Sequence, residues 1–456
     1  MMLQPCWAQA GHEGRMSIDT SHIRNFSIVA HIDHGKSTIS DRILELTHTV
    51  EERDITSQML DSMDIEQERG ITIKSNAVRV MYDADDGETY LFSLIDTPGH
   101  VDFTYEVSRS LAACEGAVLV VDATQGVEAQ TVSNATLAMN AGLDIVPCIN
   151  KIDLPSAHPE EVKQEIEDDL AIPAEDAVLV SGKTGEGIHD LLEAIVYLIS
   201  PPKGAENAPL KALILDSYFD EYRGVVATVR VFDGHIRKGD HLKMMALGDE
   251  FLADGVGCKR PLETPLDELS VGEVGYVVTG LKDPEMVRTG DTITEADNPC
   301  AEACPGYHEA KPMVFTGLFP IDTKDYENLR DALEKLKVND PSLTWSPENS
   351  VALGFGFRVG FLGLLHMEVV KERLEREFGL SLIATSPSVE YHVFKTDGTM
   401  EKITSPQDLP EPTRIDHIEE PYLKAKVIVP PEYMGPVMQL VVDHRGTTQD
   451  MVYLSE

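Results

Sequence analysis

Four short polar segments constrain the fold of this chain most strongly, because they occur in one order at workable spacings. Three of them follow apolar stretches of strand length, Phe26–Ala30, Leu91–Ile95 and Ala177–Val180. Strands that each end in a polar loop are typical of an open α/β sheet, whose ligands bind beyond the carboxyl ends of the strands. The four segments are Ala30–Ser37, Asp96–His100, Asn150–Asp153 and Ser181–Lys183.

The first segment has the pattern of a phosphate-binding loop. It leads into a helix expected to begin near Lys36, so backbone N–H groups and the helix N-terminus would point at a β-phosphate. Lys36 would add charge at the β- and γ-oxygens, and the Ser37 hydroxyl would ligate Mg²⁺. Ala30 replaces the usual first glycine, and an ordinary strand, turn and helix would also fit the segment taken alone. The residues expected to contact nucleotide here are Asp33, His34, Gly35, Lys36, Ser37 and Thr38.

The second segment, Asp96-Thr-Pro-Gly-His100, complements the first. Asp96 comes at the carboxyl end of its strand, where its carboxylate would hold Mg²⁺ through a water molecule. Gly99 would offer its backbone N–H to a γ-phosphate, with no Cβ in the way. By itself, however, an Asp-Thr-Pro-Gly run is more typical of a plain turn.

The third and fourth segments indicate which base is bound. The Asp153 carboxylate can accept hydrogen bonds from N1–H and the 2-amino group of guanine, whereas adenine has no such donor pair. A buried acceptor left unpaired by the wrong base discriminates by a factor of about 10⁴. The Lys151 stem can lie along the purine, Asn150 can bridge the loops, and the Gly182 N–H can donate to O6. The residues expected at the base are Asn150, Lys151, Asp153, Ser181, Gly182 and Lys183.

The run Glu68-Arg-Gly-Ile-Thr-Ile73, between the first and second segments, resembles the translational GTPases. In that family the threonine closes over Mg²⁺ and the γ-phosphate, so the resemblance implies this role for Thr72. His100 matches the histidine that orients the attacking water, and phosphoryl transfer needs such positioning more than a strong base. The alternative for His100 is an exposed loop histidine. The resemblance implies Lys36, Thr72 and His100 as catalytic residues, and a monovalent cation near Asp33.

Changes in composition indicate further domains. The proline-rich stretch Pro201–Pro209 follows an amphipathic helix at Leu191–Ile199 and marks a domain boundary. Beyond it, short β-branched segments separated by glycine-containing turns favour a closed barrel, similar to the second domain of translation factors. From Lys311 the order is β-α-β-β-α-β, which favours a ferredoxin-like sandwich.

The stretch Gly354–Phe378 is very similar to the LepA family, also called elongation factor 4. The GTPase core has no inserted subdomain, and no room is left for a tRNA-mimicking domain, as expected for LepA. His366, within this stretch, is best explained as a core or interface histidine. The chain ends in half a sandwich, a helix at Glu432–Val442 between strands at Tyr422–Pro430 and Gln449–Leu454, which we expect to be loosely held beyond about Pro421.

The expected fold is an α/β P-loop GTPase domain followed by an all-β barrel and ferredoxin-like α+β domains. By this interpretation the chain is a LepA-like protein without its basic C-terminal domain, and Met16 is an alternative start. The expected divisions are a tail at 1–22, a GTP-binding domain at 23–201, a β-barrel at 209–310, a ferredoxin-like domain at 311–395, a linker at 396–419 and an incomplete second ferredoxin-like domain at 420–456.

Composition limits the partners of this chain. Its 78 acidic and 38 basic residues give a formal charge of −40, which argues against nonspecific binding to nucleic acid. A ribosome would then be contacted through local basic patches, through protein contacts or through the basic C-terminal domain that the expected family has beyond this stretch. No apolar run approaches the roughly 20 residues that a membrane-spanning helix needs.

The resemblance implies a monomeric, ribosome-dependent GTPase that uses GTP and GDP with Mg²⁺ and acts on tRNA indirectly. It would promote back-translocation of tRNAs on improperly translocated ribosomes, which supports accurate synthesis under stress. Its expected location is the cytoplasm, with peripheral association at the cytoplasmic side of the cell membrane. Two alternatives stay open: a BipA-like ribosome-associated GTPase, and a GTP-gated binding module in which hydrolysis is only a reset.

Overall fold

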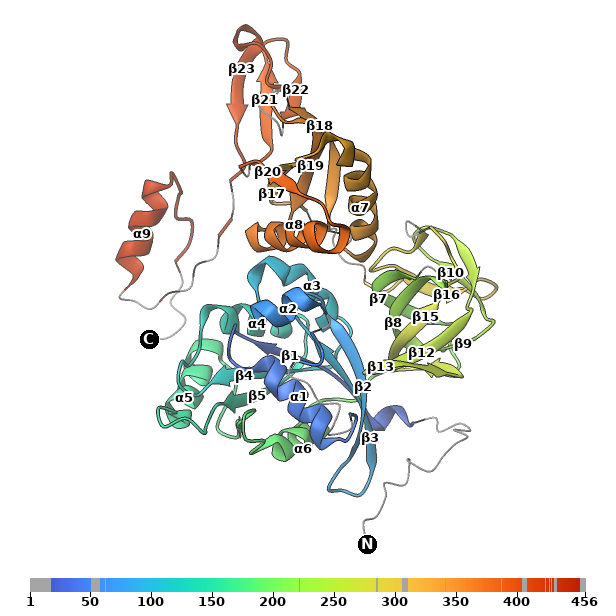
Figure 1. Cartoon of the computed structure of the whole chain (residues 1–456). Helices are drawn as coiled ribbons and strands as arrows, with labels where there is room; N and C mark the ends of the chain where they lie inside the picture. Colours follow the sequence, from blue (N-terminus) through green and yellow to red (C-terminus); the bar gives the residue numbers. More distant parts are fainter. Residues whose placement is uncertain are drawn as a thin grey trace.

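Six strands of the N-terminal domain form one mixed sheet in the order β2-β3-β1-β4-β5-β6 (Figure 1). Only β2 runs antiparallel to its neighbour. The computed structural model describes residues 18–451 except 51–57, 62, 221, 284–285, 306–310, 341, 351, 387, 404–407, 423, 426, 428 and 430–432. The strands are β1 (Ile23–Ala30), β2 (Asn76–Asp83), β3 (Thr89–Asp96), β4 (Gly116–Asp122), β5 (Asp144–Asn150) and β6 (Val178–Leu179).

Helices cover both faces of this sheet, which is why its central strand β1 reads as a continuous buried run. The apolar sides of α1 and α6 pack on one face, and those of α3, α4 and α5 pack on the other. The helices are α1 (Lys36–Leu46), α2 (Asp64–Arg69), α3 (Thr104–Leu111), α4 (Ala129–Asn140), α5 (Pro159–Leu170) and α6 (Ile188–Leu198), with short 3-10 turns η2 (Thr20–His22) and η4 (Val101–Phe103).

The second domain is an antiparallel, barrel-like β domain. Eight strands follow the order β11-β10-β16-β7-β8-β15-β12-β13, and β9 pairs separately with β14. The separate pair contributes Ile236 and Leu269 to the same apolar core as the main sheet. The strands are β7 (Lys211–Asp220), β8 (Gly224–Asp233), β9 (His235–Arg237), β10 (His241–Met244), β11 (Glu250–Leu252), β12 (Gly255–Arg260), β13 (Leu262–Leu266), β14 (Glu268–Ser270), β15 (Val274–Val278) and β16 (Thr292–Glu295).

The third domain confirms the predicted β-α-β-β-α-β sandwich. Its four antiparallel strands follow the order β18-β19-β17-β20, and α7 and α8 bury their apolar sides against them. The elements are β17 (Val314–Pro320), η6 (Thr323–Asp325), α7 (Tyr326–Asn339), β18 (Thr344–Ser350), β19 (Gly354–Phe361), α8 (Leu364–Phe378) and β20 (Leu382–Ala384). The fold class expected from the sequence is therefore present in all three domains.

His366, in the first turn of α8, is the buried interface histidine that the sequence indicated. Its Nδ1 accepts a hydrogen bond from the Leu362 N–H at 3.0 Å, and its Nε2 lies 2.6 Å from Asp340 Oδ2. Burial alone raises the pKa of Asp340, but the hydrogen-bonded imidazole of His366 and the hydroxyl and N–H of Ser342 outweigh it and lower the pKa to about 2. The pair ties the end of α7 to the start of α8.

This pair predicts a pH-dependent contribution to stability. A carboxyl with a depressed folded-state pKa stabilises the fold above its ordinary pKa near 4, and that stabilisation is lost as the pH falls through about 2. We expect Asp340→Asn to lower the free energy of unfolding by about 2 kcal/mol at pH 7, with a smaller difference at pH 3. Urea titrations of both proteins at several pH values test this. Asp331→Asn, at an exposed position on α7, is the control, and an equal loss at pH 7 and pH 3 would contradict the assignment.

The expected linker at 396–419 is instead part of a small three-stranded sheet in the order β22-β21-β23. Its strands are β21 (Tyr391–Lys395), β22 (Met400–Ile403) and β23 (Ile415–Glu419). An Asp397-Gly398 turn, with Gly398 at φ +84°, reverses the chain between β21 and β22. The abundance of proline and acidic residues in this stretch is typical of a linker, whereas the Asp-Gly pair is a hairpin signal.

The C-terminal segment forms the expected helix, α9 (Met434–Asp443), which stands apart from the other domains in Figure 1. The two strands expected around it are absent from the described residues of 422–430 and 449–451, and 452–456 lie outside the described residues, as do 1–17 with Met16. The described residues between 421 and 451 contribute no buried side chain, which agrees with the expectation of a loosely held end. None of the helices in the described part of the chain combines the length and hydropathy needed to cross a bilayer.

Candidate functional site

The predicted phosphate loop lies between β1 and α1, and the base-reading segment holds it in place. Gly35 has φ +93°, and a Cβ at this position would lie 2.3 Å from Asn150 Nδ2. This close approach lets Asn150 Nδ2 donate a hydrogen bond to the His34 carbonyl at 2.8 Å. Asp33 is also in the left-handed region, at φ +64°. The turn is therefore shaped by packing against the end of β5.

His34 contributes to this loop through its backbone. Its side chain is buried, and its Nδ1 accepts a hydrogen bond from the Asp122 N–H at 3.2 Å. Burial, followed by the nearby charge of His31, lowers the pKa of His34 to about 4. The neutral imidazole therefore binds the end of β4 and supports the loop. Its side chain is not turned to the phosphate side, in contrast to the nucleotide contact expected from the sequence.

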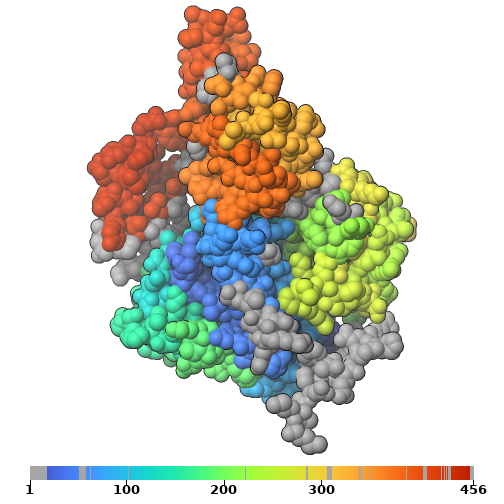
Figure 2. All heavy atoms as spheres, in the orientation of Figure 1, coloured from blue at the N-terminus to red at the C-terminus, as the bar shows by residue number. Residues whose placement is uncertain are grey.

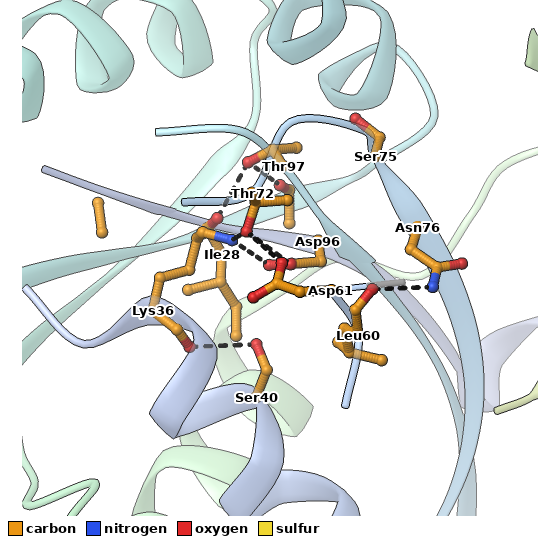
Figure 3. Close-up of polar contacts among 12 residues, drawn as sticks. Ile28, Lys36, Ser40, Leu60, Asp61, Thr72, Ser75, Asn76, Asp96 and Thr97 are labelled. Carbon is orange, nitrogen blue, oxygen red and sulfur yellow. Dashed lines mark hydrogen bonds and ion pairs between the residues drawn. The ribbon is translucent and has the colours of Figure 1, made fainter. Parts of the chain in front are cut away.

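Four side chains converge beside the loop, three of them predicted from motifs and one not (Figure 3). Lys36 Nζ lies 2.6 Å from Asp96 Oδ1 and donates a hydrogen bond to Thr72 Oγ1 at 2.7 Å. Thr72 in turn donates to Asp61 Oδ1 at 2.8 Å. All four are at least nine-tenths buried. The structure thus brings together Lys36, Thr72 and Asp96, which come from three separate segments, and we call these three with Asp61 the Lys36 cluster.

Asp61 is the member that the sequence analysis missed. It lies eleven residues before Thr72, in no recognisable motif, and only the folded chain carries it to Asp96. Burial and the charge of Asp96 raise the pKa of Asp61. They outweigh the hydrogen bonds from Thr72 and Ser37, which lower it. Asp61 Oδ2 is buried and has no hydrogen-bond partner among the described residues.

The Lys36 cluster, with Ser37 beside it, fits a magnesium ion. Mg²⁺ prefers oxygen ligands and is commonly held by one or two carboxylates, water and substrate phosphates. Two buried carboxylates face each other here, hydroxyl oxygens adjoin them, and one carboxylate oxygen is unpaired. A divalent cation would relieve the repulsion between Asp61 and Asp96 and satisfy the unpaired oxygen.

Asp61→Asn tests this fit, because it keeps the shape and the acceptor for Thr72 while it removes one charge. Loss of a supporting carboxylate typically weakens metal binding by about 10- to 100-fold. We expect the Mg²⁺ concentration for half-maximal binding of a fluorescent guanine nucleotide to rise by that factor, while the nucleotide-free protein keeps its stability because repulsion with Asp96 is relieved. Asp64→Asn, at the exposed start of α2, is the control. An unchanged Mg²⁺ dependence in Asp61→Asn would contradict the assignment.

The predicted base-reading residues also lie together. Ser181 Oγ donates to Asp153 Oδ1 at 2.8 Å, and the Gly182 N–H donates to Asn150 Oδ1 at 2.9 Å. Lys151, at φ +64°, places its Nζ 2.7 Å from Asp122 Oδ2. Lys183 is held to α1 instead, since its carbonyl accepts a hydrogen bond from Arg42 of that helix at 2.7 Å. The fourth segment thus supports the third, at the carboxyl ends of β5 and β6.

His100 is placed at the edge of this site, without a contact to the Lys36 cluster among the described residues. Its Nδ1 accepts a hydrogen bond from the Asp102 N–H at 3.1 Å, so a neutral His100 carries its proton on Nε2. The ring meets Phe103 edge to face, with centroids 6.3 Å apart. Gly99, just before it, lies against the phosphate loop, because a Cβ there would be 3.5 Å from the Ala30 carbonyl oxygen.

The segments that carry Thr72 and His100 both contact α8 of the third domain. Asp102 Oδ2 accepts a hydrogen bond from the Leu365 N–H at 2.8 Å, and Phe103 packs on the apolar cluster that contains Val369. On the other side, Arg69 of α2 lies 2.6 Å from Glu372, and Arg376 pairs with Glu68 at 2.8 Å. A displacement of either segment would therefore change its contacts with α8.

Comparisons with known proteins agree with this arrangement. The family described as Elongation factor Tu GTP binding domain matches residues 21–201, and Elongation factor Tu domain 2 matches residues 224–294. The chain is 56% identical to Elongation factor 4 of Symbiobacterium thermophilum over 96% of this chain and 73% of that protein. It is 58% identical to Elongation factor 4 of Geobacillus thermodenitrificans over 95% of this chain and 71% of that protein.

A solved structure resembles the fold as well. A crystal structure from Thermus thermophilus superposes with a TM-score of 0.63 and 20% identity, and the match covers 84% of this chain and 72% of that chain. At this level of identity, the likeness concerns the fold. Together with the sequence matches, it shows a GTP-binding domain followed by the β domain that accompanies it in translation factors.

Proposed function

Because the chain belongs to the elongation factor 4 family of translational GTPases, we propose that it hydrolyses GTP on the ribosome and thereby promotes back-translocation of tRNAs. Its substrates would be improperly translocated ribosomes, and its role would be accurate protein synthesis under stress. The observation that carries the proposal is the buried Lys36 cluster, in which groups from three segments meet beside a phosphate loop.

In the proposed site, the chain's own groups divide the work of binding. The loop N–H groups and Lys36 would hold the β- and γ-phosphates, and Asp153 would select guanine, joined by the Gly182 N–H once the base replaces Asn150 Oδ1 as its acceptor. Ser37 and Thr72 would ligate Mg²⁺, and Asp96 would hold it through water. Asp61, which lies beside Thr72, would be a further carboxylate at the ion. Bound there, the ion would neutralise charge on the phosphate oxygens. A monovalent cation near Asp33 belongs to the same proposal.

Hydrolysis then depends on positioning. His100 would orient the attacking water with the imidazole nitrogen that faces away from Asp102, and Thr72 would close over the γ-phosphate. Loss of that phosphate would remove one of the groups that hold Thr72 and would let its segment and α2 rearrange. Since α2 and η4 both contact α8, this release would reach the third domain.

The ribosome would be the partner. Because the chain carries a charge of −40, it would contact the ribosome through local basic patches or through ribosomal proteins. The proposed active form is a monomer in the cytoplasm, with peripheral association at the membrane. It would act on tRNA only indirectly, through the ribosome.

A toeprinting assay tests the direction of movement. Post-translocation ribosomes carrying a defined mRNA are incubated with the chain and GTP, and reverse transcription reads the mRNA position. A backward shift of one codon that needs GTP supports the proposal. An unchanged position in the presence of bound chain would contradict back-translocation, and the matched control is the His100→Ala variant described below.

A further inference from the structure

A pocket with a volume of about 340 Å³ lies where the three domains meet. Its walls come from β2, β3 and α3 of the GTP-binding domain, from β7, β8, β12 and β15 of the barrel, and from Arg373 of α8. Figure 2 shows these three domains packed against one another, and Figure 1 shows β2 beside β12. None of the described residues in its wall belongs to the phosphate loop or the base-reading segments, so the pocket is separate from the nucleotide site.

The charge of this wall is opposite to that of the chain. In a protein of net charge −40, the wall carries more cationic than anionic side chains. Two of the cations have carboxylate partners outside the wall: Arg79 lies 3.1 Å from Glu273, and Arg373 lies 2.7 Å from Glu377. The charged wall residues are the cations Lys74, Arg79, Lys259 and Arg373 and the carboxylates Glu106 and Asp216.

Lys259 is the least compensated cation of the wall. Lys74 has Asp216 at 2.8 Å, whereas the described residues place no carboxylate within ion-pair distance of Lys259. Lys259 Nζ donates a hydrogen bond to Asn76 Oδ1 at 3.2 Å, which leaves further N–H donors. Burial lowers its pKa, in keeping with an ammonium group that is short of partners.

Two further polar atoms in the wall are buried without a partner among the described residues. They are Arg79 Nε and Ser93 Oγ, on side chains that are 8% and 2% exposed. The two residues are paired directly in the β2–β3 register, so both point to the sheet face that is turned to the barrel. Both side chains line the same pocket as Lys259, so one acceptor placed there could satisfy them together.

The wall also contains apolar side chains, Ile95, Val274 and Tyr276 among them. Pockets of this size at domain interfaces, with a few convergent polar groups, are typical of small-molecule sites. We propose that this junction pocket binds a small organic anion, whose phosphate or carboxylate oxygens accept hydrogen bonds from Arg79, Ser93 and Lys259 while its body packs on the apolar side chains. The ligand would also touch Lys74 and Ser75, just after Thr72, and so clamp that segment to the barrel.

Direct binding to the full chain tests this site. The protein is first saturated with GDP and Mg²⁺, so that the phosphate loop does not take up the probe. Phenyl phosphate and phthalate then represent the two anionic groups on an apolar body, and phenol represents the body alone. Saturation-transfer NMR titrations give each affinity, and because no turnover is measured, the result does not depend on GTP hydrolysis.

The variants locate the binding. Lys259→Met removes the uncompensated charge, and Lys243→Met, at a partly exposed strand position of the same domain, is the matched control. Ser93→Ala removes one unpaired hydroxyl and keeps the site testable if Lys259→Met folds poorly.

We expect at least one anion to bind at least about tenfold more tightly than phenol, and Lys259→Met to weaken it by about tenfold with Lys243→Met unchanged. The stronger of the two anions identifies the acidic group as phosphate or carboxylate. Equal binding of phenol, equal binding to Lys259→Met and Lys243→Met, or no binding of either anion at millimolar concentration would each overturn the proposal. The last of these outcomes would assign the unpaired donors to water.

Discussion

Asp153→Asn should lower the affinity of this chain for GTP by about 10⁴-fold and create affinity for xanthosine triphosphate. In the variant, an amide N–H faces the N1–H and 2-amino donors of guanine, so two donors oppose each other and a buried hydrogen bond is lost. Xanthine carries a carbonyl oxygen at the 2-position, which accepts from the same amide. The fold should survive, because the amide oxygen still accepts the hydrogen bond that Ser181 now gives to Asp153.

Direct titrations with labelled GTP and with labelled xanthosine triphosphate measure both affinities, since a guanine probe alone would not stay bound to the variant. Asp168→Asn, on the exposed side of α5, makes the same chemical change away from the site and should leave GTP affinity unchanged. A variant that still prefers guanine by the original factor would show that another group selects the base. Poor binding of both nucleotides, with a normal melting temperature, would show that the carboxylate supports the loop instead of reading the base.

His100→Ala should reduce ribosome-stimulated GTP hydrolysis by about 10²- to 10⁴-fold, which is the range that a positioned acid, base or water-orienting group contributes. Nucleotide affinity should stay the same, because the imidazole contacts Asp102 and Phe103 and no residue of the Lys36 cluster among those described. The loss would therefore appear in the rate at saturating GTP. Multiple-turnover and single-turnover assays with purified ribosomes separate the two quantities.

His158→Ala is the control for this variant, since His158 is an exposed histidine just before α5 and its backbone carries its structural hydrogen bond. The experiment also separates enzyme from binding module. If the chain acts only as a GTP-gated binder, His100→Ala completes one GTP-dependent round of ribosome action unimpaired. An unchanged multiple-turnover rate would remove His100 from the catalytic group altogether.

The parts of the site that the sequence predicted are those whose chemistry requires fixed local spacing. Lys36 and Ser37 must adjoin a helix N-terminus, and Asp153 must follow a strand by a short loop, so neighbouring residues reveal them. Asp61 has no such constraint. Its carboxylate meets Thr72 and Asp96 only in the folded protein, and a single acidic residue outside a motif gives no sign of this in the sequence.

The fold shows the same division. Periodicity predicted α7, α8 and the strands between them, because their apolar sides must face one core. For the small sheet of β21, β22 and β23, composition predicts a linker, because its strands are largely exposed and lack a clear apolar pattern. No sequence pattern predicts the junction pocket, because its wall is assembled from residues of three domains.

In the proposed function, the Lys36 cluster belongs to a GTP site whose hydrolysis is triggered by the ribosome. The decisive measurement is GTP hydrolysis by this chain with and without purified ribosomes, with ATP and Asp153→Asn as controls. We expect slow hydrolysis by the chain alone, strong stimulation by ribosomes with GTP only, and loss of that stimulation in Asp153→Asn. Hydrolysis that ribosomes leave unchanged while they bind the GTP-loaded chain, or equal turnover of ATP, would contradict it.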